Sequence, residues 1–178
     1  YNLASATNQS LFMDYYYISN ENADLKESVN ELQNSLSSCE TKLAEATEDN
    51  NIEADYSYAL YDDYGNKTDI TVDQIKNLKY EATDLGMTQD SVDVVLSIAM
   101  HESGGQEAVK NPCSTAAGYC GILDTTGKYV WNDIMGNNDY CYSILFNGED
   151  NLSISLNYIK YLTTIEGDNL SSVLTDYA

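Results

Sequence analysis

The sequence predicts a mainly α-helical protein, in which a long coiled-coil helix precedes a small α-helical domain. Three observations predict this fold class. Residues 11–46 repeat every seven residues, apolar stripes with helical spacing recur in the second half of the chain, and capping residues and glycines bound those stripes. We therefore divide the 178 residues into a coiled-coil stalk over 1–47, a linker over 48–70 and a helical domain over 71–178.

The stalk follows one heptad register, in which the seam residues alternate at spacings of four and three. The seam consists of Leu11, Tyr15, Ile18, Asn22, Leu25, Val29, Leu32, Leu36, Cys39, Leu43 and Ala46. Sustained heptads of this length indicate a coiled coil, and Asn22 on the seam fits a parallel oligomer whose register it fixes. The number of strands stays open, as does the choice between self-association and pairing with another protein. A single long helix packed on a larger assembly is the alternative.

Residues 48–70 are rich in Asp, Asn and Tyr, which predicts a linker or a short irregular region. The next helix starts at Thr71, because Thr71 and Gln74 have the form of a capping box. Its apolar stripe consists of Ile75, Leu78, Ala82 and Leu85. Gly86 then ends the helix.

A further helix begins near Thr88, which can cap it, and Asp90 lies favourably in its first turn. Its apolar face consists of Val95, Ile98 and Ala99. By the helical period Glu102 follows on this face, in the last turn before Gly104. Burial and the negative end of the helix dipole both favour the protonated carboxyl, which is the form that a glycosidase needs as general acid. The alternative is a Glu102 that reaches into solvent past the helix end.

The charge balance excludes two classes of partner. There are 29 acidic residues against 8 basic ones, all of them Lys, for a net charge of −21. Phosphate recognition needs clustered Lys and Arg, so we expect no nucleic acid. Docking on an anionic membrane surface is disfavoured for the same reason, and no apolar run is long enough to span a bilayer. The chain starts at Tyr1 without an initiator Met, which is compatible with a preceding signal or anchor segment.

The cysteines predict no metal site. Cys39, Cys113, Cys120 and Cys141 form no CxxC pair, and one His is too few for a Cys/His zinc site. A Cys113–Cys120 or Cys120–Cys141 disulfide fits a protein that works outside a reducing cytosol, and buried free thiols are the alternative. We expect no metal and no cofactor.

Three segments in order resemble one family. Residues 102–126 read ESGGQEAVKNPCSTAAGYCGILDTT and resemble the catalytic stretch of the lysozyme-like lytic transglycosylases of phage virions and bacterial wall-remodelling systems. The matching positions are Glu102, Ser103, Gly104, Asn111, Pro112, Ser114, Ala116, Gly118, Leu123, Asp124 and Thr126. Residues 147–162 resemble the downstream helix of this family, and the closing LTDYA resembles the start of its last groove segment. The likeness covers residues 88–178.

The resemblance implies a lysozyme-like domain that cleaves peptidoglycan with one carboxyl group. Glu102 would protonate the glycosidic oxygen between N-acetylmuramic acid and N-acetylglucosamine. It would then assist attack by the muramic acid 6-hydroxyl, which gives a 1,6-anhydro product. Ser103 would support Glu102 and the turn after it, and Gly118 would let the backbone approach the sugar. The substrate-binding residues would be Ser103, Gly118, Tyr119, Asp124 and Tyr177, of which Tyr177 matches the family Tyr that lines the groove.

The sequence departs from the family at Gly121, where most members carry a Gln that contacts substrate, and at Ile122 and Gly127, where members carry aromatic residues. Asp124 is the nearby candidate for a substrate contact or a second carboxylate, which would permit hydrolysis; capping of the next helical turn is the alternative that we favour. The aromatic residues Tyr129, Trp131, Tyr140 and Tyr142 fit either sugar stacking or the core.

The leading expectation is a peptidoglycan lytic transglycosylase tethered by its coiled coil, most simply a murein-degrading component of a phage virion or tail. Its partners would be peptidoglycan glycan strands and, through the seam, a second copy or other virion assembly proteins. Its location would be the virion or the extracellular envelope. The alternative is a structural or wall-binding virion protein with a degenerate, inactive lysozyme-like domain.

Overall fold

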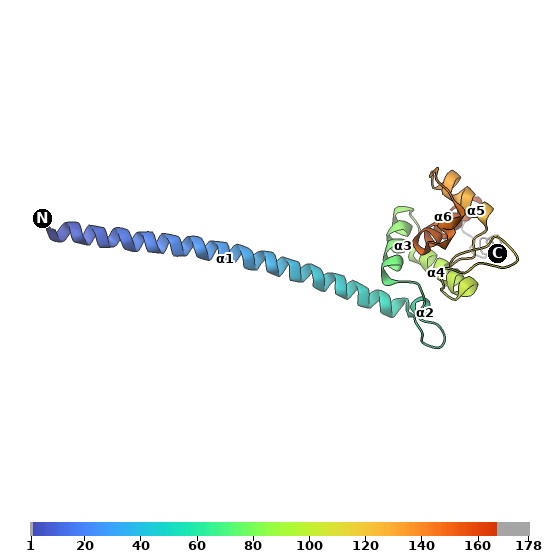
Figure 1. Cartoon of the computed structure of the whole chain (residues 1–178), viewed down its shortest axis with the longest axis horizontal. Helices are drawn as coiled ribbons and strands as arrows, with labels where there is room; N and C mark the ends of the chain where they lie inside the picture. Colours follow the sequence, from blue (N-terminus) through green and yellow to red (C-terminus); the bar gives the residue numbers. More distant parts are fainter. Residues whose placement is uncertain (1, 167–178) are drawn as a thin grey trace. The chain divides into compact units, whose positions relative to one another are not determined.

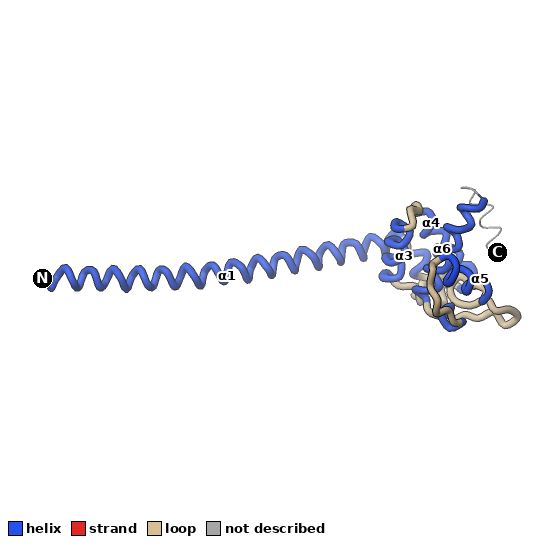
Figure 2. The backbone as a smooth tube through the Cα atoms, turned by 90° about the horizontal axis from the view of Figure 1, so that it is seen from above, coloured by secondary structure: helices blue, strands red, loops and turns tan. Residues whose placement is uncertain are grey.

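The computed structural model describes residues 2–166 and is mainly helical. Within that range the chain forms helices and loops, with isolated β-bridges in place of strands (Figure 2). The chain divides into two compact units, the first ending at Glu48 and the second starting at Asp49. None of the helices among the described residues is long and apolar enough to cross a membrane.

The first unit consists of the N-terminal part of α1 (Asn2–Asp55), one uninterrupted helix whose last turns belong to the second unit (Figure 1). The prediction of a long helix is confirmed, and the helix continues past the predicted stalk end at residue 47. The apolar seam residues from Leu11 to Leu43 are all exposed.

The predicted linker over 48–70 belongs instead to the core of the second unit. Its apolar side chains are buried, namely Ile52, Tyr56, Ala59, Leu60 and Ile70. The last turns of α1 and the short α2 (Ser57–Leu60) carry most of them. Most of the Asp and Asn residues that suggested a linker are exposed, and they lie beside these apolar residues or in the loop after α2.

The second unit is organised by α3 (Val72–Asp84), α4 (Gln89–Ser103) and α6 (Gly148–Glu166), which pack against one another (Figures 1 and 2). The predicted capping box of α3 is confirmed, since Thr71 and Gln74 bond reciprocally. Thr88 is the first residue before α4 as expected, but its side chain makes no capping bond. The core contributed by these helices includes Ile75, Leu78, Val92, Val95, Leu96, Ala99, Leu152, Leu156 and Ile159.

Three short helical turns complete the second unit, the last two of which pack against α6. They are α5 (Asp124–Tyr129), the π-helical turn η1 (Val130–Ile134) and the 3₁₀ turn η2 (Tyr142–Phe146). Between α4 and α5 the chain forms a compact loop region, in which backbone bridges join Lys110 to Ala117 and Ala117 to Ile122.

Candidate functional site

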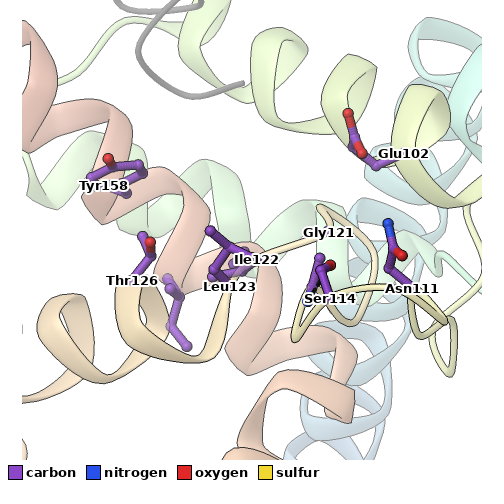
Figure 3. Close-up of a pocket in the computed structure, with 10 residues that line it drawn as sticks. Glu102, Asn111, Ser114, Gly121, Ile122, Leu123, Thr126 and Tyr158 are labelled. Atoms are coloured by element: carbon purple, nitrogen blue, oxygen red, sulfur yellow. Dashed lines mark hydrogen bonds between the residues drawn. The ribbon is translucent and has the colours of Figure 1, made fainter.

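A cleft of about 450 Å³ lies in the second unit, between the end of α4, the loop region after it, α5 and α6. Figure 3 shows Glu102 at the end of α4, with Tyr158 of α6 and Thr126 of α5 across from it. The lining residues are Glu102, Asn111, Ser114, Ala116, Gly121, Ile122, Leu123, Thr126, Ile154 and Tyr158. Among these ten described residues Glu102 is the only charged one.

Glu102 lies in the last turn of α4, as predicted, but it is exposed and not buried on the apolar face. The buried stripe of α4 runs through Val92, Leu96 and Ala99, and one further step of four residues leads to the half-buried Ser103. Glu102 therefore lies at the edge of the stripe, and its side chain is exposed. The desolvation expected from the sequence is absent in this structure.

The turn after Glu102 is held by Ser103. Its hydroxyl donates to the Ala99 carbonyl at 2.8 Å and accepts the Gln106 N–H at 3.2 Å. Gly104 then adopts a left-handed conformation with φ of 64°, which ends the helix. Ser103 thus does what was expected of it for the turn, and it does not line the cleft.

The wall of the cleft opposite α6 is a loop with internal bonds. Asn111 accepts the Cys113 N–H on its side-chain oxygen at 2.8 Å, and Ser114 accepts the Ala116 N–H at 3.2 Å. A backbone bond from Asn111 N–H to the Ala116 carbonyl closes the loop. The amide group of Asn111 and the hydroxyl of Ser114 are therefore presented to the cleft on a fixed backbone.

Gly121 lies directly beside the carboxylate of Glu102. A Cβ added at Gly121 would be 3.0 Å from Glu102 Oε2 and 3.4 Å from Glu102 Cβ. The φ of Gly121 is +59°, a conformation that favours glycine. The position where the resembled family carries Gln thus makes room here for the Glu102 side chain.

Gly118 does not face the cleft, contrary to the expectation that it lets the backbone approach a sugar. It is buried, with φ of +77°, and a Cβ there would collide with the Leu145 carbonyl oxygen and the Asn151 side chain. Asn151 is fully buried in α6 and accepts the Cys120 N–H at 2.9 Å, while its amide donates to Leu145 O at 2.9 Å and to Ala117 O at 3.2 Å. Gly118 therefore allows the loop to pack on α6.

Tyr119 is a core residue and not a groove residue. Its side chain is fully buried, and its hydroxyl lies 3.5 Å from Gln74 Oε1. Burial raises the pKa of Tyr119 above its ordinary value of 10.0. Its neighbours Gly118 and Cys120 are buried as well, so this whole stretch of the loop packs into the core.

Asp124 opens α5 without capping it. The residue before α5 is Leu123, and Asp124 Oδ1 accepts the Tyr140 hydroxyl at 2.9 Å while its N–H donates to Thr115 Oγ1 at 3.2 Å. Asp124 is not among the cleft residues, so it is not placed as a second carboxylate beside Glu102. Its role here is to join the loop to Tyr140.

The remaining expectations have mixed outcomes. Tyr177 lies outside the described residues. The four aromatic residues considered for sugar stacking are absent from the cleft lining; their contacts include Trp131 to Asp139, Tyr129 to Tyr161 and Tyr142 to Phe146. Neither proposed disulfide is formed, since Cys113 and Cys141 are exposed free thiols and Cys120 Sγ is buried 3.8 Å from the Val95 carbonyl.

Four polar or aromatic cleft residues were not assigned to the site from the sequence, namely Asn111, Ser114, Thr126 and Tyr158. The first three are matched positions in the resemblance, which was the available signal. Tyr158 lies on α6 opposite Glu102, and no local pattern distinguishes it from its neighbour Tyr161. Within residues 2–166 no three His, Cys, Asp or Glu side chains are grouped to hold a metal ion.

Comparison with known proteins assigns this chain to no family. No protein-family model matches the sequence, and no curated protein matches it.

Proposed function

We propose that the second unit is a peptidoglycan-cleaving lytic transglycosylase that uses Glu102 as its single catalytic acid and base. The observation that carries this proposal is the cleft, where one carboxylate at a helix end faces polar groups and an aromatic ring, and where Glu102 is the only charged residue among the described lining residues. A glycan strand is uncharged along its sugar rings, and it is recognised by such hydroxyl, amide and aromatic groups. The resemblance over residues 102–126 supports the same assignment.

In the proposed mechanism Glu102 first donates its proton to the glycosidic oxygen, and the C1–O bond breaks. The resulting carboxylate then takes the proton of the muramoyl 6-hydroxyl as that oxygen forms a bond to C1. The products are a 1,6-anhydro sugar and a free 4-hydroxyl, with no water consumed. Asn111 and Ser114 would position the sugar by hydrogen bonds.

The net charge of −21 bears on how the protein reaches the cell wall. An acidic protein is repelled at long range by an anionic envelope, so its affinity for the wall comes from the groove or from whatever delivers the domain. We infer a tethered enzyme of a phage virion or cell envelope, with α1 as the tether.

Digestion of purified peptidoglycan tests the proposal, with products identified by mass spectrometry. We expect anhydro-muropeptides from the unmodified chain and a loss of at least about 100-fold in rate for Glu102→Gln, the usual scale of a general acid–base contribution. Asp63→Asn is the matched control, because Asp63 is exposed and does not line the cleft. Reducing ends in place of anhydro ends would identify a hydrolase and contradict the transglycosylase mechanism.

A second candidate is a wall-binding protein with an inactive domain, and Gly121 is the observation that favours it, because a family substrate contact is missing there. Sedimentation with peptidoglycan separates the two. Retained binding with no release of muropeptides by the unmodified chain would support the binding protein and exclude the enzyme.

A further inference from the structure

We infer that the first unit forms a parallel, two-stranded coiled coil with a second copy of this chain, in register, so that Cys39 of one copy faces Cys39 of the other. The inference concerns α1, and it holds whether or not the second unit is an enzyme. It rests on three features of α1, which are the exposure of its seam, the place of its polar seam residue and the position of its charges.

The seam of α1 is an apolar stripe that no part of the first unit covers. Leu25 is 62 % exposed, Leu32 is 70 % exposed and Leu43 is 69 % exposed. The other exposed apolar seam residues are Leu11, Tyr15, Ile18, Val29 and Leu36. A monomeric protein rarely exposes an apolar stripe of this extent, and burial of each Leu or Val side chain against a partner is stabilising. The helix therefore gains stability from a partner along its whole seam.

The spacing fixes the heptad positions and the direction of the partner. The step from Tyr15 to Ile18 is three residues and the step from Ile18 to Asn22 is four, so Asn22 is an a position and Cys39 is a d position. In a parallel pair, a faces a and two Asn22 amides can bond to each other. In an antiparallel pair a faces d, and every d position of this seam is apolar or Cys39. A parallel pair in register is the arrangement that satisfies Asn22.

Charges beside the seam permit pairing with an identical chain. In a parallel pair each g residue faces the e residue five positions later on the partner. Glu21 at g then faces Lys26 at e of the other copy, and no like-charged pair arises in any heptad. The facing g and e residues are Asp14 and Ser19, Glu21 and Lys26, Ser28 and Gln33, Ser35 and Glu40, and Lys42 and Thr47.

The remaining acidic residues of the stalk lie on the side of the helix that faces away from the seam. They occupy the c and f positions, and they are Asp24, Glu27, Glu31, Glu45 and Glu48. An acidic helix would normally repel its own copy, and this placement keeps those charges away from the interface. The sequence therefore combines charge complementarity at the flanks with an apolar seam, which identifies a second copy as the partner.

Oxidative cross-linking at Cys39 tests direction and register together. Cys39 is exposed in the single chain, and in the proposed dimer it pairs with itself. We would use the full chain with Cys113→Ser and Cys141→Ser, which removes the other exposed thiols. With diamide as oxidant, two thiols give up two protons and two electrons, one S–S bond forms and the diazene becomes a hydrazine. We expect a covalent dimer on a non-reducing gel, which Cys39→Ser abolishes.

A mixed experiment fixes the register. A chain with Leu25→Cys and Cys39→Ser in the same background is expected to cross-link with itself. Mixed with the chain that keeps Cys39, it should give no 25-to-39 disulfide, because the two positions are separated by about 21 Å along an in-register pair. A mixed disulfide, or no Cys39 dimer at all, would contradict the parallel in-register pair.

Light scattering after size exclusion gives the number of copies. We expect a mass of about twice 19.8 kDa for the unmodified chain, and a monomer for the double variant Leu25→Glu and Leu32→Glu. The matched control places the same charges off the seam, at Asn30→Glu and Asn34→Glu, and should remain a dimer. An unchanged Trp131 emission spectrum would show that the second unit stays folded. A monomeric or trimeric unmodified chain would overturn the proposal.

Discussion

Replacement of Gly118 by Ala is expected to destabilise the second unit far more than the same change at Gly136. Both glycines have φ of +77°, so the backbone strain of a left-handed alanine is the same in both variants. At Gly136 the added methyl group meets nothing within 4 Å. At Gly118 it would come well inside 3.0 Å of Leu145 O and of the Asn151 amide nitrogen, and 2.6 Å from Asn151 Cγ.

The expected loss in the free energy of unfolding follows from the groups that must move to accept the added methyl group. The common strain is worth about 1–2 kcal/mol, and this is the whole loss expected for Gly136→Ala. At Gly118 the loop must also separate from α6, which adds an overpacking cost of about 1–3 kcal/mol. If the Asn151 bonds to Leu145 and Cys120 break, buried backbone groups lose their partners, at about 1–3 kcal/mol each. We expect Gly118→Ala to lower the free energy of unfolding by about 3–6 kcal/mol in total.

Urea denaturation followed by Trp131 fluorescence measures this difference. Trp131 is the single Trp of the chain and lies in the second unit, so the signal reports the unfolding of that unit. The free energies are compared at an unchanged urea slope. Losses within about 1 kcal/mol of each other for the two variants would refute the packing role of Gly118.

Two further predictions concern buried polar groups of the second unit. Asn151→Ala should lower the free energy of unfolding by about 2–5 kcal/mol, because the Cys120 N–H loses its acceptor in the core. The control is Asn138→Ala at an exposed position, which should change the free energy of unfolding by about 0.5 kcal/mol at most. Equal effects of the two variants in urea denaturation would contradict this prediction. Burial raises the pKa of both Tyr119 and Tyr140 above the ordinary 10.0. The unfolded chain therefore ionises first, and the stability that these groups contribute is complete below pH 10.0 and is lost as pH rises toward their folded values. Urea midpoints on both sides of pH 10.0 should show this loss, and Tyr119→Phe with Tyr140→Phe should reduce it.

Much of the helical architecture follows from local patterns. The heptads of residues 11–46 predict the long helix, because their period alone places the apolar residues on one side. The capping box at Thr71 and Gln74 places the start of α3, since both bonds form between residues three apart. Glycines past the ends of α3 and α4 place those ends for the same local reason.

The candidate site was predicted in part. The position of Glu102 at a helix end follows from Gly104, and the matched segment brought Asn111, Ser114 and Thr126 into consideration without assigning them to the site. Tyr158 was missed because it reaches the cleft from α6, far along the chain. The linker prediction over 48–70 was wrong because composition does not show which apolar residues find a core.

The sequence by itself determined the long helix, the start of α3 and the ends of α3 and α4, because these depend on residues within a few positions of each other. Only the tertiary structure decided which side chains are buried and which face the cleft. Gly118 and Tyr119 turn toward α6 because Asn151 bonds the loop from the other side. Glu102 is exposed because the buried stripe of α4 passes through Ser103. Burial depends on what packs from distant parts of the chain, and no local pattern contains that information.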